Sequence, residues 1–395
     1  MKIVIAGGGI GGLATAIACA LRGHAVSVHE QAPALSEIGA GLQISPNGWK
    51  VLEALGVTDR LQETAFEPEA IEMRMGRSGR RVFRLPMKGY AKGRWGAPYM
   101  HVHRADLVDA LAGRLGEIAP NAVHTGQTVT GYEKIGARAA LTVGDTAEEG
   151  DVIVGADGLH SVIRTQMIGP DRPTYTGNVA WRAVVPVDAL GTDAPPPTAC
   201  VWAGNKRHAV TTRLRRGTVA NFVGMVEAPD PGPEGWRIEG ARAEVQADFD
   251  GWHPTITRLI AEAPVLNKWA LFDRAPLPRW HDGPVVLLGD ASHPMLPSMA
   301  QGAVQALEDA WVLAACLDAG RTDIPAALQA FRDARIDRVS RIQAGSRANA
   351  RLFHRASLLG RVGFYGPMAI GARLAPGLIH ARQDWVYRHD VTAAP

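Results

Sequence analysis

Glycines near the start of the chain form the first pattern with a chemical use. Gly7, Gly9 and Gly12 follow the apolar run 2–6 with the spacing Gly-x-Gly-x-x-Gly. Such a turn lets the backbone approach a pyrophosphate, and the helix after it offers N–H groups and partial positive charge to the phosphates. Glu30 stands 21 residues after Gly9, close to the ~20 residues that usually separate this turn from a carboxylate on the ribose. The spacing predicts a dinucleotide site without distinguishing NAD from FAD.

Two further carboxylates each follow a short apolar run. Asp157, with Gly158 after it, ends the run 151–156, and Asp290 ends the run 284–289. Because α/β folds place ligands at the carboxyl ends of their parallel strands, both carboxylates are candidates for ligand contacts. For Asp157 a second interpretation stays open, since an aspartate at a strand-to-helix junction often caps the helix.

The elements that must position these residues alternate between strands and helices. The opening segments predict strand 2–6, helix 11–22 and strand 25–30, which together form a βαβ unit. Apolar spacing elsewhere predicts helices at 46–63, 103–115, 303–317 and 324–353, strands within 71–85, a hairpin from 122–132 and 139–144, and buried parallel strands at 151–156 and 284–289.

Residues 173–228 differ from their surroundings. Apolar and polar residues alternate there, β-branched residues increase, and runs rich in Pro and Gly lie at 195–197 and 229–235. Alternation of this kind predicts a separate antiparallel sheet. We therefore expect an α/β protein in which a Rossmann-like dinucleotide-binding domain is interrupted by a β-rich substrate domain and followed by a helical tail. The expected parts are 1–172, 173–275, 276–320 and 321–395.

Composition excludes several classes of protein. With 46% hydrophobic and 21% charged residues, the chain can bury a full core and is not expected to be disordered. A net charge of +3 argues against a dedicated nucleic-acid binder. Cys19, Cys200 and Cys316 are too few and too far apart for a disulfide framework or a metal site, which favours a reducing cytoplasm. Five glycines interrupt the uncharged run 3–21, so we favour strand, turn and helix over a signal peptide or membrane anchor.

The three motifs occur together, in order and over essentially the whole chain, in a pattern that resembles the single-component FAD-dependent aromatic hydroxylases, the class A flavoprotein monooxygenases. Shorter segments are similar to the salicylate hydroxylase, 3-hydroxybenzoate 6-hydroxylase and 6-hydroxynicotinate 3-monooxygenase group; they are 39–47, 103–107, 180–182 and 384–387. The resemblance implies a noncovalent FAD, and insertion of one atom of O2 into a small phenolic or hydroxy-heteroaromatic acid with NAD(P)H as reductant. It implies no nucleic-acid or membrane partner and is compatible with a homodimer.

The resemblance also assigns residues to the cofactor. Gly7, Gly9 and Gly12 would line the FAD pyrophosphate, and Glu30 would bind the adenosine ribose. A surface ion pair is the alternative for Arg104. The remaining assignments are Arg104 at the phosphate–ribityl part, Asp157 near the pyrophosphate, Asp290 at a ribityl hydroxyl, Pro294 and Pro297 beside the flavin and the substrate, and Gly302 and Ala303 at the flavin N1–C2=O edge, where a helix N-terminus favours negative charge.

The same resemblance points to a base. Related enzymes often carry His-x-x-x-Tyr in the substrate sheet, and this chain has His208 and Thr212 at those two positions. His208 is therefore the first candidate for accepting the proton of a substrate phenol, whose pKa of about 10 makes a base useful at neutral pH. An ordinary strand histidine is the alternative, and His293 is the second candidate base. Because Thr212 is shorter than the usual tyrosine, the ring substrate stays open.

Three more residues are candidates for substrate contacts. Arg182 and Arg213 carry the charge that a substrate carboxylate needs, although a solvated strand face also explains Arg213. Gln43 stands where the hydroxynicotinate branch tends to have histidine, so it disfavours that substrate. A row of arginines spaced by three residues predicts a solvated helix face paired with nearby aspartates; these residues are Arg332, Arg335, Arg338 and Arg341, with Asp333 and Asp337.

Two other functions stay open at this point. An NAD(P)-dependent dehydrogenase of Rossmann type explains the first motif but leaves the other two without a task. A flavin-binding protein without turnover would need neither a substrate sheet nor a base. Because the sequence has no second Gly-x-Gly-x-x-Gly, NAD(P)H is expected to bind across the domain boundary. NADH is favoured, since no cluster of basic residues for a 2′-phosphate is evident.

Overall fold

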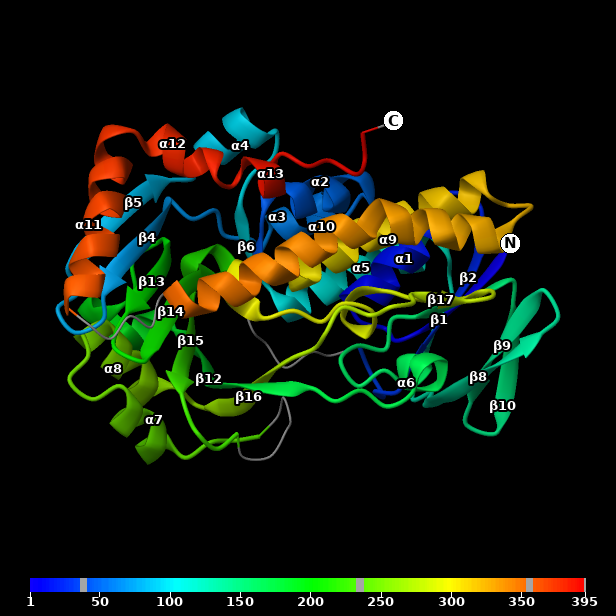
Figure 1. Cartoon of the computed structure of the whole chain (residues 1–395), viewed down its shortest axis with the longest axis horizontal. Coiled ribbons are helices and arrows are strands. Elements are labelled where there is room, and N and C mark those ends of the chain that lie inside the picture. The colour runs from blue at the N-terminus through cyan, green and yellow to red at the C-terminus, as the bar shows by residue number, and fades with distance from the viewer. Residues whose placement is uncertain (36–40, 232–237, 353–357, 394–395) are drawn as a thin grey trace.

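The computed structural model describes residues 1–35, 41–231, 238–352 and 358–393. Figure 1 shows an elongated molecule with one β-sheet region toward each end and two long helices, α9 (Gly302–Ala319) and α10 (Ile324–Leu352), running between them. None of the helices in these ranges is long and apolar enough to span a bilayer.

The first region contains a six-stranded sheet in the order β17-β18-β11-β1-β2-β7. Its strands are parallel except at the edge, where β17 runs antiparallel to β18. The central strands are continuously apolar because both of their faces are buried. The strands are β1 (Lys2–Ala6), β2 (Ala25–Glu30), β7 (Val123–Thr125), β11 (Val152–Gly155), β17 (His281–Asp282) and β18 (Val285–Leu287).

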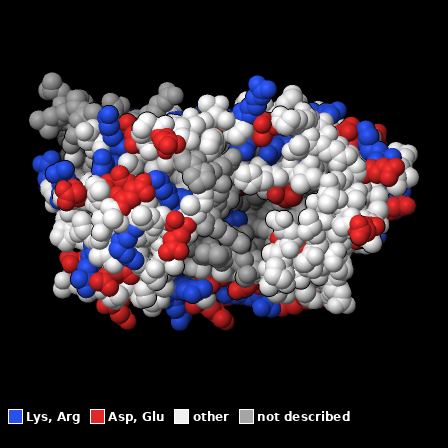
Figure 2. All heavy atoms as spheres, turned by 90° about the horizontal axis from the view of Figure 1, so that it is seen from below, with Lys and Arg blue, Asp and Glu red and all other residues white. Residues whose placement is uncertain are grey.

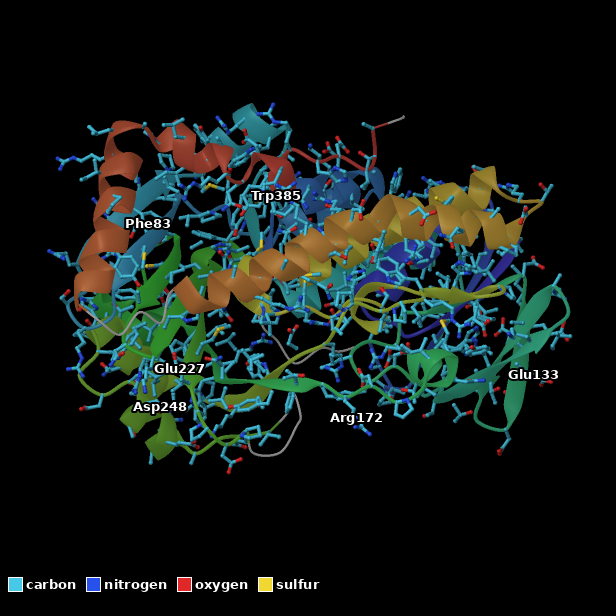
Figure 3. All side chains as sticks on the ribbon, viewed as in Figure 1. Phe83, Glu133, Arg172, Glu227, Asp248 and Trp385 are labelled. Carbon is cyan, nitrogen blue, oxygen red and sulfur yellow. The ribbon has the colours of Figure 1, made fainter. Side chains whose placement is uncertain are left out.

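Helices cover one face of this sheet, and a small antiparallel sheet covers the other. Ile3 and Ile5 of β1 pack into a core with the helices α1, α5 and α9, while Val4 and Ala6 point to the opposite core. Glu133 marks the small sheet at one end of the molecule in Figure 3. The covering elements are α1 (Ile10–Ala20), α5 (Arg104–Ile118) and α6 (Val162–Ile168), and the strands β8 (Val129–Ile135), β9 (Arg138–Val143) and β10 (Thr146–Gly150).

The second region is a seven-stranded sheet in the order β16-β12-β15-β14-β13-β4-β5. All neighbours are antiparallel except β13 and β4, which run parallel. Alternate residues of β12 divide between the faces: Trp181 and Ala183 pack under the helices α7 and α8, whereas Arg182 faces the opposite way. The bounds are β4 (Ala70–Met75), β5 (Arg81–Pro86), β12 (Thr174–Pro186), β13 (Ala199–Ala203), β14 (Arg207–Leu214), β15 (Val219–Glu227), β16 (Asn267–Asp273), α7 (Arg242–Asp248) and α8 (Pro254–Glu262).

Short elements and the C-terminal helices connect the two regions. The two-stranded sheet of β3 and β6 lies between them, because the backbone N–H of Gly41 donates to Asn221 of the large sheet (3.1 Å). In Figure 1 the C-terminal helices lie over the end of the molecule that holds β4 and β5. These elements are β3 (Gly41–Ile44), β6 (Met100–His103), α2 (Pro46–Ala54), α3 (Thr58–Gln62), α4 (Tyr90–Trp95), α11 (Leu358–Leu374), α12 (Pro376–Ala381) and α13 (Asp384–Tyr387).

The fold class predicted from the sequence is confirmed, with two differences in detail. The single helix expected over 46–63 is two helices, α2 and α3, because Gly56 takes φ +74° between them. The antiparallel sheet expected within 173–228 also contains β16 and, from far earlier in the chain, β4 and β5. The end of the helix expected to reach Phe353 lies outside the described residues, and the domain boundaries stay predictions.

Candidate active site

A cavity of ≈ 1070 Å³ lies where the two sheets meet, bordered by the carboxyl ends of β1 and β11, by the N-termini of α1 and α9 and by one face of the large sheet. Ligand pockets usually measure about 300–1,000 Å³, so this cavity is large enough for more than one ligand. Figure 2 shows a hollow near the middle of one face of the molecule, with acidic and basic side chains interspersed around it. Of the predicted site residues, those that line the cavity are Gly7, Gly9, Glu30, Gln43, Arg104, Asp157, Arg182, His208, Asp290, Pro294, Pro297, Gly302 and Ala303.

The glycine turn has the form that a pyrophosphate site requires. Gly7 has φ +102°, and a Cβ there would collide with the carbonyl oxygen of Ala156. A Cβ on Gly12 would collide with Gly7, so this glycine packs the helix against the strand and does not itself line the cavity. A Cβ on Gly9 would meet nothing within 4 Å. The turn is therefore closed on the protein side and open on the cavity side, at the N-terminus of α1, where a phosphate fits.

Glu30 lies at the end of β2, as expected. Its carboxylate accepts the backbone N–H groups of Gly8 (2.8 Å) and Ala32 (2.9 Å). These two bonds fix the carboxylate beside the glycine turn and leave its remaining lone pairs for a ribose hydroxyl.

Asp157 combines the two roles that the sequence left open. Its carboxylate accepts from the Ser161 hydroxyl (2.6 Å) and from the backbone N–H groups of Val162 (2.8 Å) and Ile163 (3.2 Å), so it caps α6. It also lines the cavity beside the open glycine turn. Burial raises the pKa of this carboxyl, and the three hydrogen bonds oppose that rise.

Arg104, Arg182 and Asp290 form a charged group where the two sheet regions meet. The Asp290 side chain lines the cavity. The protein around it shields its carboxyl from bulk water, which raises the carboxyl pKa, although the charge of Arg104 opposes the rise. The Arg182 guanidinium lies 4.4 Å from the ring centre of Trp269, and burial together with Arg104 lowers its pKa to about 10. Two neighbouring cations in a half-buried place favour an anionic ligand there. Asp106, one of the acids close to Arg104 in the sequence, pairs with Arg215 (2.6 Å), and Arg104 lines the cavity.

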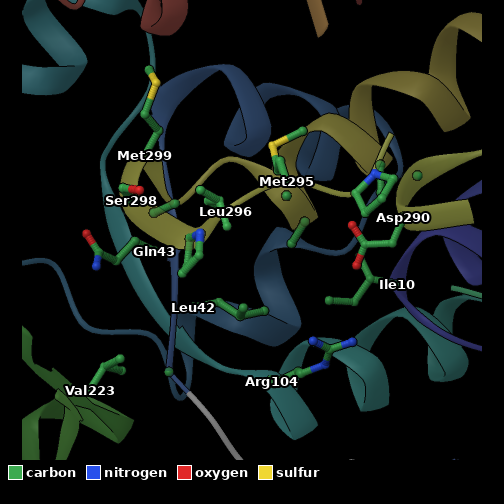
Figure 4. A pocket seen from close by; sticks show the side chains of 18 of the residues that line it. Ile10, Leu42, Gln43, Arg104, Val223, Asp290, Met295, Leu296, Ser298 and Met299 are labelled. Atoms are coloured by element: carbon green, nitrogen blue, oxygen red, sulfur yellow. The ribbon is translucent and has the colours of Figure 1, made fainter. Parts of the chain in front are cut away.

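The N-terminus of α9 faces the cavity through Gly302 and Ala303. Ala300, just before it, has φ +51°, a left-handed conformation that costs a residue with a Cβ about 1–2 kcal/mol. This turn follows Pro297–Met299 and brings the helix N-terminus to the cavity wall. Figure 4 shows Leu296, Ser298 and Met299 along this wall, with Asp290 and Arg104 at its other end.

Alternate residues of four strands of the large sheet form the apolar part of the cavity. Ile71 and Met73 on β4, Val201 on β13, Val210 on β14 and Val223 on β15 all point into it. His208 shares this face; its neighbours across β14 are Ala203 and Met225, and it is 2% exposed. A polar imidazole on an otherwise apolar wall is well placed to contact the substituent of a bound ring.

The second base candidate and one of the predicted arginines lie elsewhere. His293 does not line the cavity: its Nε2 lies 2.5 Å from Asp309 Oδ2, in the core behind α9. Arg213 donates from Nε and Nη2 to the carbonyl oxygen of Pro195 (2.9 and 2.6 Å), so the prediction that it holds a substrate carboxylate is not supported. Thr212 does not line the cavity either, and its hydroxyl accepts the amide of Asn221 (3.2 Å).

The prediction that the arginine row on α10 is a solvated face is wrong for its two middle members, Arg335 and Arg338. Arg335 is 1% exposed and donates to Asp309 (2.7 Å), Glu308 (2.6 Å) and Gln305 (2.7 Å) of α9. Arg338 binds the same Glu308 carboxylate and donates to the carbonyl oxygens of Trp385 and Val386 (3.0 Å each). Arg332 pairs as expected, with Asp333 (3.1 Å). Arg341 is exposed as predicted, and its guanidinium lies 3.9 Å from the ring centre of Trp385. The spacing led to a wrong prediction because Glu308 and Asp309, the acids that Arg335 and Arg338 bind, lie on α9.

Sequence reasoning missed the aromatic part of the cavity wall. Trp95, Tyr99, Trp385 and Tyr387 line it, and the Trp95 and Tyr387 rings meet edge to face with their centres 5.0 Å apart. Figure 3 labels Phe83 of β5 at the end of the molecule beside α11, and Trp385 of α13 closer to the middle. The segment 384–387 resembles the related hydroxylases, but that resemblance assigned no role to Trp385 or Tyr387. Gly39 and Ala40 of the similar segment 39–47 lie outside the described residues.

Comparisons with known proteins agree with this geometry. A family model described as FAD binding domain matches residues 1–342. The 6-hydroxynicotinate 3-monooxygenase of Bordetella bronchiseptica is 36% identical over 88% of this chain and 91% of its own length. The 3-amino-4-hydroxybenzoate 2-monooxygenase of Streptomyces platensis is 36% identical over 89% of this chain and 88% of its own length.

A solved structure gives the same picture. Klebsiella pneumoniae HpxO complexed with FAD and uric acid superposes with a TM-score of 0.84 at 28% identity, covering 96% of both chains. The cradle at Gly9, the helix N-termini and the Arg104–Asp290 group are a fitting set of contacts for FAD. The chain therefore belongs to the class A flavoprotein hydroxylases and is an FAD-dependent aromatic-ring monooxygenase.

Proposed function

We propose that this chain hydroxylates a small phenolic or hydroxy-heteroaromatic acid, with NADH as reductant and O2 as the oxygen source. The observation that carries the proposal is the continuity of one cavity. Gly9, Arg104 and Asp290 line its proposed cofactor end, and an apolar face of the large sheet that bears His208 lines the other end. Bound FAD supplies the activation of O2 and the transfer of one oxygen atom to the ring.

The residues of the chain divide the binding work along the cavity. Gly7, Gly9 and the N-terminus of α1 hold the pyrophosphate, with Gly12 keeping the turn tight. Glu30 binds the ribose, and Asp290 accepts from a ribityl hydroxyl. The remaining assignments are Arg104 and Asp157 near the phosphates, Gly302 and Ala303 at the electron-rich edge of the flavin, and Pro294 and Pro297 against its ring.

His208 acts on the substrate. A phenol with a pKa of about 10 is almost fully protonated at neutral pH, and its conjugate base is far more electron-rich. In our proposal His208 accepts that proton, which raises the reactivity of the ring at the ortho and para positions. The apolar and aromatic walls keep water away while the oxygen atom is transferred.

The carboxylate of the substrate needs a charged or polar hydrogen-bond donor in the cavity. Arg182 is a candidate for holding it, because its charge beside Arg104 favours an anion. The relatives support an acid as substrate, since their names specify 3-hydroxybenzoate, 6-hydroxynicotinate and 3-amino-4-hydroxybenzoate. A cytoplasmic location fits this chemistry and the three unpaired cysteines, Cys19, Cys200 and Cys316.

The test is a substrate panel with the purified holoenzyme. The panel contains 3-hydroxybenzoate, 6-hydroxynicotinate and 3-amino-4-hydroxybenzoate, each with an analogue that lacks the ring hydroxyl. NADH consumption and the mass of the product are measured for each compound. We expect one of the hydroxylated acids to stimulate NADH oxidation and to gain 16 mass units, the mass of the one oxygen atom that this reaction class inserts. We expect NADPH to serve less well. If the purified protein contains flavin but no phenolic acid stimulates its oxidation of NADH, the proposal is wrong. A non-catalytic flavin-binding role would then be favoured.

A further inference from the structure

A hydrogen bond between two cavity residues had no counterpart in the sequence patterns. Tyr99 lies just before β6, and its hydroxyl donates to Oε1 of Gln43 on the paired strand β3, with an O–O distance of 2.5 Å. Both side chains line the cavity. In Figure 4 the Gln43 amide points to the side on which Met299 and Val223 lie, away from Asp290. It therefore faces the substrate half of the cavity.

The amide oxygen of Gln43 can only accept, so the Tyr99 hydroxyl is the donor of this bond. The Tyr99 side chain is 4% exposed, and burial raises the pKa of its hydroxyl well above the ordinary value, so the hydroxyl stays protonated and donates. Oε1 of Gln43 is thereby occupied as an acceptor. In the part of the chain that the structure describes, no side chain or carbonyl accepts from Gln43 Nε2. Two N–H groups of a fixed amide are left to face the cavity.

The position of the Tyr99–Gln43 pair bears on the tyrosine that this chain lacks at position 212. On the large sheet, His208 and Thr212 lie on the same face four residues apart, so they mark opposite ends of it. At the Thr212 end, Asn221 donates to the Thr212 hydroxyl (3.2 Å) and accepts the backbone N–H of Gly41 (3.1 Å). Strand β3 is thus attached over that end of the sheet and brings Gln43 there.

We propose that Tyr99 is a positioning residue for substrate: it orients the Gln43 amide so that Nε2 donates to the carboxylate of the aromatic acid, while the ring hydroxyl lies toward His208. Tyr99, just before β6, thus supplies a phenol group at the end of the site where β14 has Thr212. This inference rests on the proposed function, and it deepens it by assigning the two ends of the substrate. It predicts a preference for acids whose carboxylate and hydroxyl lie on different sides of the ring.

The experiment measures binding, because binding does not depend on turnover. The holoenzyme is titrated with 3-hydroxybenzoate, 6-hydroxynicotinate and 3-amino-4-hydroxybenzoate and with the decarboxylated analogue of each, and the change in the flavin absorption spectrum gives Kd. The variants are Tyr99→Phe, Gln43→Leu, Gln43→Glu and the double variant Tyr99→Phe/Gln43→Leu. Tyr90→Phe is the matched control, since Tyr90 packs against the same apolar cluster as Tyr99 but does not line the cavity. FAD content and Tm of each variant verify that it is folded.

The expected pattern separates positioning from packing. Gln43→Leu should raise the Kd of the acid by ~10-fold or more, as expected for a lost hydrogen bond to a charged group, and Tyr99→Phe by a smaller ~3- to 10-fold. The double variant should be no worse than Gln43→Leu, because Tyr99 acts through Gln43. Gln43→Glu keeps the partner of Tyr99 but should reject the acid. The decarboxylated analogues and Tyr90→Phe should change by less than about 2-fold.

Different failures have different meanings. If the wild-type enzyme binds an acid and Tyr99→Phe binds it equally well, or if the two single effects multiply in the double variant, the positioning role is wrong and the proposed function stands. The same holds if Arg182→Met, and not Gln43→Leu, removes the preference for the acid. If none of the three acids perturbs the flavin spectrum of the wild-type enzyme, the proposed substrate class is wrong, and the inference falls with it.

Discussion

The buried arginine on α10 offers a sharp test of the structure, since the sequence pattern treats it like its neighbours. We consider Arg335→Met with Arg332→Met as the matched control on the same helix. Arg335 is 1% exposed and donates three hydrogen bonds to Asp309, Glu308 and Gln305. Arg332 is partly exposed, and its partner Asp333 is mostly exposed. The same chemical change is therefore made once in the core and once at the surface.

The magnitude can be worked out in two ways. Removing one partner of a buried ion pair costs about 3–5 kcal/mol, because it leaves an uncompensated charge. Independently, burial alone would raise the pKa of Glu308, but Arg335 and Arg338 outweigh it and lower that pKa from 4.5 to about 2. A shift of that size corresponds to about 3 kcal/mol of interaction at neutral pH, which Arg335 shares with Arg338 and the Asn47 amide. An exposed pair such as Arg332–Asp333 contributes about 0–1 kcal/mol.

The assay is thermal unfolding of the holoenzyme, followed by circular dichroism at several pH values. For a chain of 395 residues, we expect Arg335→Met to lower Tm at pH 7 by roughly 4–6 °C and Arg332→Met by about 1 °C or less. In the wild type the depressed pKa of Glu308 means that its stabilisation is present above pH 4.5 and is lost as the pH falls toward 2. In Arg335→Met the pKa values of the Glu308 and Asp309 carboxyls should rise, because burial then acts without the opposing charge of Arg335. Protonation on acidification then neutralises the negative charge that Arg338 and His293 alone do not balance. The gap in Tm between variant and wild type should therefore narrow between pH 7 and pH 4. Equal Tm values for the two variants, or a gap that does not narrow, would refute the reasoning.

Two further predictions concern the cofactor and the base. Asp290→Ala should weaken FAD binding by ~10- to 100-fold, since a ribityl hydroxyl loses a charged partner; the ratio of flavin to protein after gel filtration measures it, and an unchanged ratio would remove Asp290 from the cofactor site. His208→Ala should lower hydroxylation by ~10²–10⁴-fold with normal FAD content, and raising the pH toward the pKa of the substrate phenol should partly restore the rate. A variant with the wild-type rate and pH profile would mean that the proton goes elsewhere.

The parts of the fold that could be predicted from the sequence depend on local signals. A short apolar run before glycines predicts β1 and the turn into α1, because both faces of a central parallel strand are buried and a close turn needs residues without a Cβ. The carboxylates Asp157 and Asp290 were located for the same reason, as each follows such a run. Nothing beyond a few neighbouring residues is needed for these predictions.

The parts that could not be predicted depend on contacts between distant segments. The parallel pairing of β13 with β4 joins residues 199–203 to 71–75, and no periodicity within either strand specifies its partner. The arginine row has the same spacing whether it faces water or the acids of another helix. A signal was present in Glu308 and Asp309, because two adjacent acids within an otherwise apolar helix need buried cations.

His208 and Thr212 show what the alternation of side chains along a strand can and cannot predict. On β14 Ala209 and Thr211 point to the helix-covered core, so His208, Val210 and Thr212 must share the other face. That argument excludes His208 from the core under α7 and α8, but it applies equally to Thr212, which is covered by β3 and does not reach the cavity. A side chain becomes part of a site only where no distant segment covers its face. For this reason the residue that supplies a phenol group at the far end of the cavity, Tyr99, is found through its hydrogen bond to Gln43 rather than through any spacing along the substrate sheet.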